Sequence, residues 1–360
     1  MTIKVGIIGT GNIGTHHIST FSAMQDVKVA AIFDTNQERA ESGARLAGDA
    51  RNAKSVEELI NNSDAVVVAT PDGLHSPMSL QVLAAGKHLL CEKPLTCSID
   101  EARAVANAAS SASKNGIIHM VNFTYRRSAG MQEAMRLVKS GALGQIRQVQ
   151  SSYLQSWLSG RTSWDNKDWT AFYLIWKLSR SAGSRGVLGD LGCHLLDMTT
   201  ICSEDLTAVR CELRTFPKIL ENEGIFTEYN GKALDANDTA FIELQFVNGG
   251  IGIAHTSRWA TGYSNSLRLE VHGTEGAIRL DLDQSYDAIE LCLGESRHRQ
   301  QWDRKYMPAT PTNQERFITS IRTGEQDQPD LLRGAKIQAC LEACFTSAES
   351  HNWETIPVVN

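Results

Sequence analysis

Short apolar runs rich in valine, isoleucine and alanine alternate with amphipathic stretches through the first third of the chain. The apolar runs predict buried strands over residues 3–8, 27–33, 65–69, 87–91 and 117–121. The stretches between them have helical periodicity near residues 13–24, 36–47, 56–61, 75–85 and 99–114. Because buried strands that alternate with helices form parallel sheets covered on both faces, we expect an α/β domain over residues 1–122.

In the second part of the chain, the pattern of predicted elements changes. Strands with few helices between them are predicted over residues 145–154, 206–216, 237–247, 250–259, 266–273, 277–282 and 288–293. Asn248-Gly249-Gly250 suits a tight hairpin turn, and two late helices are predicted near residues 313–321 and 330–350. We therefore expect an α+β domain over residues 123–360, built on a large, mostly antiparallel, open-faced sheet. An open sheet face favours a homo-oligomer, a dimer or a tetramer.

Composition narrows the class of protein. A length of 360 residues favours two domains, and a net charge of -6 argues against a nucleic-acid partner. No apolar run approaches the roughly 20 residues of a membrane span, and the N-terminus enters a strand without the features of a secretory signal. The eight cysteines are scattered without a CxxC pair. These features favour reduced thiols and a cytoplasmic protein without a membrane partner.

A glycine-rich loop follows the first predicted strand and precedes the first helix. Its residues are Gly9, Thr10, Gly11, Asn12, Ile13 and Gly14. Asp34 ends the second strand, twenty residues after Gly14. This arrangement is typical of the doubly wound dinucleotide-binding (Rossmann) fold, in which the three glycines allow a sharp turn, approach to the pyrophosphate and close helix packing. Asp34 would accept hydrogen bonds from the adenosine ribose, and no arginine follows directly, so NAD is favoured over NADP.

Polar residues stand where three of the predicted strands end. They are Thr70-Pro71, Glu92-Lys93-Pro94 and Asn122. Ligands of doubly wound sheets bind at the carboxyl ends of the strands, so we expect these residues to line one crevice with the glycine loop. A lysine beside a nicotinamide can donate to a substrate oxygen. A surface Lys-Pro turn is the alternative interpretation of this motif.

A second chemical motif lies at residues 189–197, and the closely spaced glycines Gly183, Gly186 and Gly189 precede its Asp190. Asp190 and His194 are four residues apart, and Asp197 follows one turn later, so a helix would place them on one face. An aspartate near a histidine suits a general base, although an exposed helix pair has the same spacing. A metal site would need more ligands at characteristic spacing, and we expect no metal.

These motifs, in this order, resemble the glucose-fructose oxidoreductase / inositol dehydrogenase / rhizopine catabolism (Gfo/Idh/MocA) family. The resemblance covers essentially the whole chain and implies hydride transfer between NAD and a hydroxyl carbon of a sugar or cyclitol. By resemblance, His194 would take the hydroxyl proton, Lys93 would bind the same oxygen and share in proton transfer, and Asp190 would orient the substrate. The division of labour between Lys93 and His194 stays open. The resemblance also implies a cis Lys93–Pro94 bond and cofactor contacts from Thr70, Pro71, His75, Glu92 and Lys93.

Aromatic residues ahead of the histidine motif suit a sugar pocket. Four tryptophans lie between residues 157 and 176, and aromatic faces pack well on the C–H faces of sugar rings. We expect one or two of them at most to contact the substrate. The family often has a second glycine where this chain has Ser184-Arg185, which would put Arg185 near the ligand. The expected substrate contacts are Lys93, Asn122, Tyr153, Trp157, Trp164, Arg185, Asp190 and His194.

Two other functions fit the same motifs. One is a redox-neutral enzyme that retains NAD and oxidises a sugar transiently before elimination or glycoside cleavage. The other is a non-catalytic sensor that binds NAD, although a sensor has no need to keep Lys93, Asp190 and His194 together. The function we expect is an NAD-dependent dehydrogenase or reductase of a sugar or cyclitol.

Overall fold

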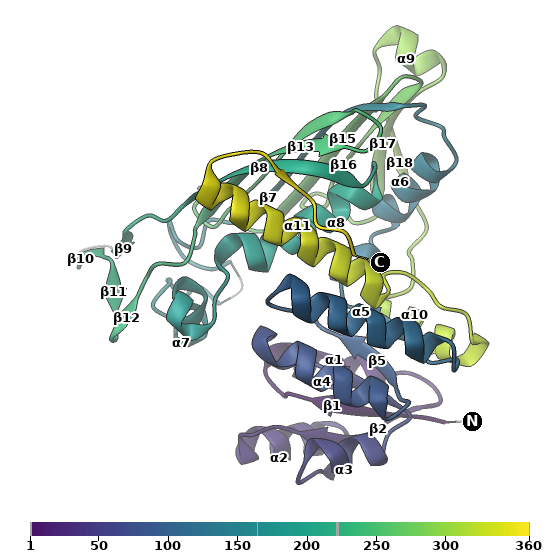
Figure 1. Ribbon diagram of the computed structural model, residues 1–360, viewed down its shortest axis with the longest axis vertical. Coiled ribbons are helices and arrows are strands. Elements are labelled where there is room, and N and C mark those ends of the chain that lie inside the picture. The colour runs from purple at the N-terminus through teal and green to yellow at the C-terminus, as the bar shows by residue number, and fades with distance from the viewer. Residues whose placement is uncertain (1, 164, 221–222, 360) are drawn as a thin grey trace. The chain divides into compact units, whose positions relative to one another are not determined.

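The computed structural model of the chain (Figure 1) describes residues 2–163, 165–220 and 223–359. The chain divides into two compact units: Met1–Thr124 with Pro311–Gln338 and Val358–Asn360, and Tyr125–Thr310 with Ala339–Pro357. The division expected from the sequence assigned everything after residue 122 to one domain. Residues 311–338 belong instead to the first unit, because Phe317 and Ile318 of helix α10 (Asn313–Thr323) are buried in its apolar core.

The first unit is a six-stranded parallel sheet with the strand order β3-β2-β1-β4-β5-β6. The strands are β1 (Ile3–Ile8), β2 (Val27–Phe33), β3 (Arg51–Asn52), β4 (Ala65–Val68), β5 (His88–Cys91) and β6 (His119–Val121). The helices between them are α1 (Asn12–Ser22), α2 (Gln37–Leu46), α3 (Val56–Asn61), α4 (His75–Ala84) and α5 (Ile99–Ser113). This order is that of the doubly wound dinucleotide-binding fold, so the predicted fold class is confirmed. The two-residue strand β3 was not predicted.

The second unit is built on a nine-stranded sheet with the order β18-β17-β16-β15-β7-β14-β13-β8-β19. Its strands are β7 (Ile146–Leu154), β8 (Leu206–Arg214), β13 (Thr239–Phe246), β14 (Ile251–Ser257), β15 (Ser266–Gly273), β16 (Gly276–Asp281), β17 (Ala288–Leu293), β18 (Asp303–Tyr306) and β19 (Glu354–Thr355). Neighbouring strands are antiparallel except β7 and β14, which run parallel. The predicted mostly antiparallel sheet is confirmed.

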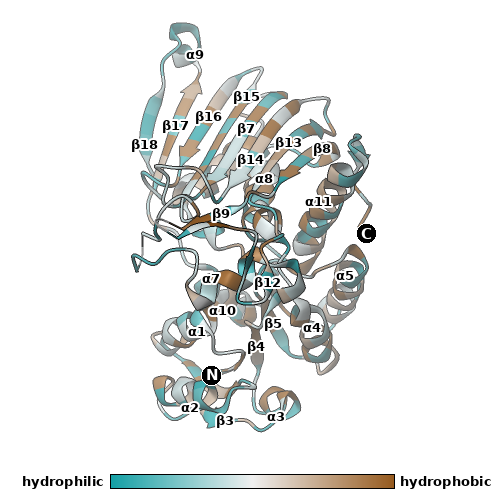
Figure 2. Ribbon diagram, turned by 90° about the vertical axis from the view of Figure 1, so that its left-hand side faces the viewer, coloured by the Kyte–Doolittle hydropathy of each residue, from teal (hydrophilic) through white to brown (hydrophobic). Residues whose placement is uncertain are grey.

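Helices cover one face of this sheet, and the other face is open (Figure 2). The covering elements are α6 (Ala129–Lys139), α8 (Cys193–Ile201) and the part of α11 (Leu331–Ser350) that belongs to this unit. Along β13, buried and exposed residues alternate strictly from Ala240 to Phe246, as a half-covered sheet requires. No helix of the described residues is both long and apolar enough to cross a membrane.

Candidate active site

The glycine loop after β1 leaves open space at the start of helix α1. Gly9 has a positive φ of 90°, and a Cβ there would lie 2.6 Å from the carbonyl oxygen of Ala69. A Cβ on Gly14 would lie 2.0 Å from the Gly9 carbonyl oxygen, whereas one on Gly11 would meet nothing within 4 Å. Gly11 is also the N-cap of α1 and supplies no side-chain cap. The open space and the uncapped N–H groups fit a dinucleotide pyrophosphate.

Asp34 is tied to the glycine loop at the end of β2. Its Oδ2 accepts hydrogen bonds from the backbone N–H and the hydroxyl of Thr10 at 2.8 and 2.9 Å, and its Oδ1 accepts from the N–H of Asn36 at 2.8 Å. Burial raises the pKa of Asp34, but these hydrogen bonds outweigh burial and hold the pKa below its ordinary value. Asp34 is therefore an anion at neutral pH, which fits ribose hydroxyls and disfavours a 2′-phosphate.

Glu92 is the centre of a buried polar network at the end of β5. Its Oε1 lies 2.8 Å from Nε2 of His17 and accepts a hydrogen bond from the Asn122 amide at 2.6 Å. Burial raises the pKa of Glu92, yet the His17 and Asn122 hydrogen bonds lower the pKa to about 2. Asn122 in turn accepts from Asn313 of α10 at 3.0 Å. Glu92, the residue directly before Lys93 in the chain, is thus hydrogen-bonded to Asn122 in the interior.

Lys93 stands beyond the carboxyl end of β5. The backbone N–H of Lys93 donates to Oε2 of Glu92 at 3.3 Å, and the Lys93–Pro94 bond is cis, as the resemblance implied. The buried His75 at the start of α4 has one ring nitrogen 2.7 Å from the Pro94 carbonyl and the other 2.9 Å from the Thr70 carbonyl. His75 therefore joins the loops after β4 and β5. Contacts of Thr70, Pro71, His75, Glu92 and Lys93 with a cofactor stay predictions.

Asp190 lies on a π-helical turn, Leu188–Gly192, and not on the regular α-helix that the spacing predicted. The turn leads directly into α8, which carries His194 and Asp197. Such turns are frequent at functional sites. Oδ2 of Asp190 accepts hydrogen bonds from Lys177 Nζ at 2.8 Å and from Arg258 Nη2 at 2.9 Å. Two cations therefore hold this carboxylate in place.

His194 is set against two tyrosine rings. The ring centroids of His194 and Tyr125 are 5.0 Å apart at an interplanar angle of 81°, and those of His194 and Tyr153 are 6.2 Å apart at 66°. The imidazole is buried, with 7 % of the residue exposed. Burial raises the pKa of Tyr153 well above its ordinary value, and the neighbouring Tyr125 acts in the same direction. The phenol of Tyr153 thus stays protonated at neutral pH.

Other residues singled out in the sequence take structural positions. Asp197 forms a buried bidentate pair with Arg126, at 2.7 Å for both hydrogen bonds. Arg185 stacks on Phe345 of α11 at 4.1 Å and lies 3.5 Å from a carboxylate oxygen of Glu342. Within the described residues, no group of three or more histidine, cysteine, aspartate or glutamate side chains is arranged to hold a metal ion.

The tryptophans that were considered for a sugar pocket differ in exposure. Trp157 and Trp169 are buried in one apolar cluster, and Trp176 is 37 % exposed. Trp164 lies outside the described residues. Contacts of Trp157, Trp164 and Arg185 with a substrate stay predictions.

Several residues that organise the site were missed from the sequence: Arg258, Lys177, Asn265, Gln155 and His17. One of them had a recognisable signal. Every second residue of β14 faces inward at Ala254 and Thr256, and Arg258 continues this alternation just beyond the strand. Arg258 is fully buried. A charged residue at an inward-facing position of a predicted strand requires a buried partner, which is Asp190 here.

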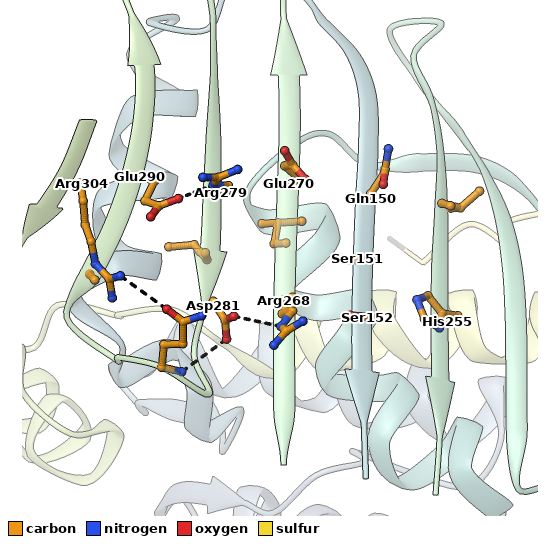
Figure 3. Close-up of a pocket in the computed structure, with 15 residues that line it drawn as sticks. Gln150, Ser151, Ser152, His255, Arg268, Glu270, Arg279, Asp281, Glu290 and Arg304 are labelled. Carbon is orange, nitrogen blue, oxygen red and sulfur yellow. Dashed lines mark hydrogen bonds and ion pairs between the residues drawn. The ribbon is translucent and has the colours of Figure 1, made fainter. Parts of the chain in front are cut away.

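A separate depression of about 390 Å³ lies on the open face of the large sheet (Figure 3). Ion pairs cross its floor between neighbouring strands, Arg268 with Asp281 and Arg279 with Glu290. Arg304 on β18 donates to Gln284 at the edge of the same depression. The charges that line this depression are paired with one another across neighbouring strands, unlike the mostly apolar lining of a typical small-molecule site.

Comparisons with known proteins identify the family of both halves of the chain. The family model described as "Oxidoreductase family, NAD-binding Rossmann fold" matches residues 3–123, and the GFO/IDH/MocA C-terminal domain matches residues 131–279. The chain is 27% identical to levoglucosan dehydrogenase of Pseudarthrobacter phenanthrenivorans over 99% of both chains. It is 25% identical to inositol 2-dehydrogenase of Rhizobium meliloti over 96% of this chain and 97% of that one.

Solved structures include a levoglucosan dehydrogenase in complex with NADH and levoglucosan. That structure matches with a TM-score of 0.85 and 25% identity, over 99% of this chain and 100% of that chain. The two family models together span well over half of the residues. The chain therefore belongs to the Gfo/Idh/MocA family of NAD-binding oxidoreductases.

Proposed function

We propose that this protein is an NAD-dependent dehydrogenase that oxidises a hydroxyl carbon of a sugar or cyclitol, or reduces the corresponding ketone. The observation that carries the proposal is the setting of His194, a buried imidazole held between two tyrosine rings and preceded by an ion-paired Asp190. The relatives that act on levoglucosan and inositol support the substrate class.

The proton is handled by side chains of the protein. His194 accepts the hydroxyl proton while the C–H bond of the same carbon breaks, and the alcohol becomes a carbonyl. Lys93 donates a hydrogen bond to the same substrate oxygen, and this hydrogen bond makes it easier for the hydroxyl to lose its proton. Asp190 accepts hydrogen bonds from neighbouring hydroxyls of the ring. Bound NAD supplies the acceptor for the hydride.

Residues of the first unit favour NAD over NADP. The anionic Asp34 keeps acceptor capacity on Oδ1, which has one hydrogen bond from the protein, whereas Oδ2 has two. The remaining lone pair of that oxygen can accept a ribose hydroxyl, and a 2′-phosphate would be repelled by its charge.

We also propose that a second copy of this chain covers the open sheet face. Phe241, Ile251 and Ile253 are 58%, 63% and 52% exposed there, and Phe241 stacks on His255 with centroids 5.3 Å apart. Exposed apolar surface flanked by paired charges is typical of a self-complementary interface. Light scattering of the wild type should give a dimer or tetramer, and Phe241→Lys with Ile253→Glu should give a smaller species. A wild-type monomer would refute this part.

Among the described residues the eight cysteines form no disulfide. Reduced thiols fit a cytoplasmic enzyme, and we propose that compartment.

Two substitutions test the assignment of the proton-handling residues. Lys93→Met and His194→Ala should each lower kcat by about 10²- to 10⁴-fold while the affinity for NADH changes little. The assay is NADH formation from a panel of polyols, aldoses, anhydrosugars and glycosides. Wild-type turnover in either variant would remove that residue from the mechanism. Glycoside cleavage without net NADH would identify the redox-neutral alternative.

A further inference from the structure

A hydrogen-bonded chain begins at Trp157 and ends at the tyrosines beside His194. The indole Nε1 of Trp157 donates to Oε1 of Gln155 at 2.9 Å. An indole N–H can only donate, so the oxygen of the Gln155 amide must face it. The amide nitrogen of Gln155 is then directed at Asn265, where it donates to Oδ1 at 2.8 Å. Trp157 thereby fixes the orientation of both amides.

Asn265 closes a directed cycle with the two tyrosines. Its Oδ1 also accepts from the hydroxyl of Tyr153 at 2.8 Å, and its Nδ2 donates to the hydroxyl oxygen of Tyr125 at 3.0 Å. Because the Tyr153 proton is used on Asn265, the contact between the two hydroxyls must use the Tyr125 proton. Each of the three side chains therefore donates to the next in one direction around the cycle.

The cycle fixes the two tyrosine rings that contact the imidazole of His194. The rings of Tyr125 and Tyr153 meet at 89° with centroids 5.6 Å apart, and they form a corner. Both rings contact the imidazole at a steep angle. A rotation of either tyrosine would break the cycle, so the orientation of the imidazole is coupled to hydrogen bonds that His194 does not itself make.

We propose that Asn265 is a positioning residue for His194, acting through the cycle with Tyr125 and Tyr153, and that the Tyr153 hydroxyl serves this cycle and not the substrate. The proposal rests on the dehydrogenase function above, since it assumes that His194 handles the proton. It replaces the expectation that Tyr153 binds substrate.

Two substitutions of nearly the same size at residue 265 test the cycle. Asn265→Leu removes every hydrogen bond, and Asn265→Asp keeps the acceptor but removes the donor to Tyr125. Both should lower kcat, by about tenfold to hundredfold for leucine and less for aspartate, because a small displacement of a catalytic group has effects of this size. KM for the sugar should stay within about twofold, since no substrate contact is lost.

Tyr153→Phe separates positioning from substrate binding. We expect a moderate fall in kcat with KM unchanged, because the phenyl ring still forms the corner. A tenfold or larger rise in KM, with kcat retained, would show that the hydroxyl binds substrate and would overturn the proposal.

A spectroscopic measurement decides the question without turnover. The ring ¹H–¹³C signals of His194, assigned with the aid of His194→Ala, should shift or broaden in Asn265→Leu because the aromatic corner no longer holds one geometry. Asn248→Leu is the matched control, since Asn248 is an amide that bonds Ile146 at the opposite end of β7. Its His194 signals should match those of the wild type.

Unchanged His194 signals and unchanged kcat in Asn265→Leu would overturn the positioning role and leave the dehydrogenase function standing. If no sugar or cyclitol is oxidised by the wild type, the proposed function fails, and the spectra still show whether the cycle holds the imidazole.

Discussion

Nη2 of Arg258 lies 2.9 Å from Oδ2 of Asp190, and the same guanidinium donates to the carbonyl oxygens of Lys177 and Gly186 at 2.9 and 3.4 Å. It also lies over the ring of Trp157, 5.3 Å from the centroid. One buried side chain therefore connects three points of the segment that carries Asp190. Arginine suits this position because its fork can serve several acceptors in a fixed geometry.

Replacing Arg258 should weaken both the fold and the activity. Arg258→Met removes one of the two cations that hold Asp190 and one donor each from the carbonyl oxygens of Lys177 and Gly186. Because these groups lie around a buried guanidinium, the free energy of unfolding should fall by about 3 kcal/mol. We expect kcat/KM to fall at least about tenfold, and Arg258→Lys, which keeps the charge but not the fork, to be intermediate. Urea unfolding and steady-state kinetics measure the two effects.

Arg316→Met is the control, because Arg316 forms a partly exposed bidentate pair with Asp327 in the first unit. It should change stability by less than about 1 kcal/mol. Equal effects of the two substitutions would contradict the role of Arg258.

Acid stability should depend on Glu92. Its pKa of about 2 lies below its ordinary value of 4.5 because the hydrogen bonds from His17 and Asn122 outweigh burial. A depressed carboxylate pKa stabilises the fold above the unfolded pKa, and that stability is lost as the pH falls from about 4.5 toward 2. Glu92→Gln should therefore lower the free energy of unfolding by about 3 kcal/mol at pH 7, with a difference that shrinks below pH 4.5.

Urea unfolding from pH 7 to pH 3 measures the Glu92 effect. Glu57→Gln, at an exposed position of α3, should show no such trend. A Glu92→Gln difference that stays constant with pH would argue against the charged form of Glu92.

Two glycines of the same loop should respond differently to alanine. A Cβ on Gly14 would lie 2.0 Å from the Gly9 carbonyl oxygen, so Gly14→Ala should destabilise the first unit by several kcal/mol. Gly11 has an extended backbone and open space, so Gly11→Ala should fold normally. Its methyl group would enter the space offered to the pyrophosphate, and the Kd for NADH should rise about tenfold or more. Normal NADH affinity in a folded Gly11→Ala protein would place the pyrophosphate elsewhere.

Cofactor preference should follow the charge at residue 34. Asp34→Ser removes the anion, and Arg39, whose charge already helps to lower the pKa of Asp34, then becomes available to a 2′-phosphate. We expect the Kd for NADPH to fall about tenfold and that for NADH to rise. The double variant Asp34→Ser with Arg39→Ala should lose the gain for NADPH. Calorimetric titration compares the two cofactors, and a wild type that prefers NADPH would refute the argument from Asp34.

The regular parts of both units could be predicted from local sequence. Strand β1, strand β15 and helix α3 have the predicted bounds. The spacing of apolar residues and the residues that begin a helix can both be recognised within a short stretch of sequence. Helix α6 was not predicted although it is amphipathic, and the short strands β9 (Lys218–Leu220) and β10 (Gly224–Phe226) were missed as well. A strand of three residues is too short to show an alternation of apolar and polar positions, so only its pairing with a neighbouring strand defines it.

The candidate site was predictable only where chemistry lies in a short motif. Lys93, Asp190 and His194 stand in such motifs, but the groups that orient them come from distant parts of the chain. Arg258 is 68 residues from Asp190, and Gln155 is 110 residues from Asn265. The π-helical turn at Leu188–Gly192 was also invisible, since its residues fit an ordinary helix equally well.

Helix α10 has a practical consequence for dissecting the molecule. Phe317 and Ile318 complete the interior around Ile7, Val67 and their neighbours, although some two hundred residues of chain separate them from β6. A fragment that stops at residue 124 would expose that interior to water and would be prone to aggregate. Excising a self-sufficient nucleotide-binding fragment therefore requires residues 1–124 to be spliced directly to residues 311–338.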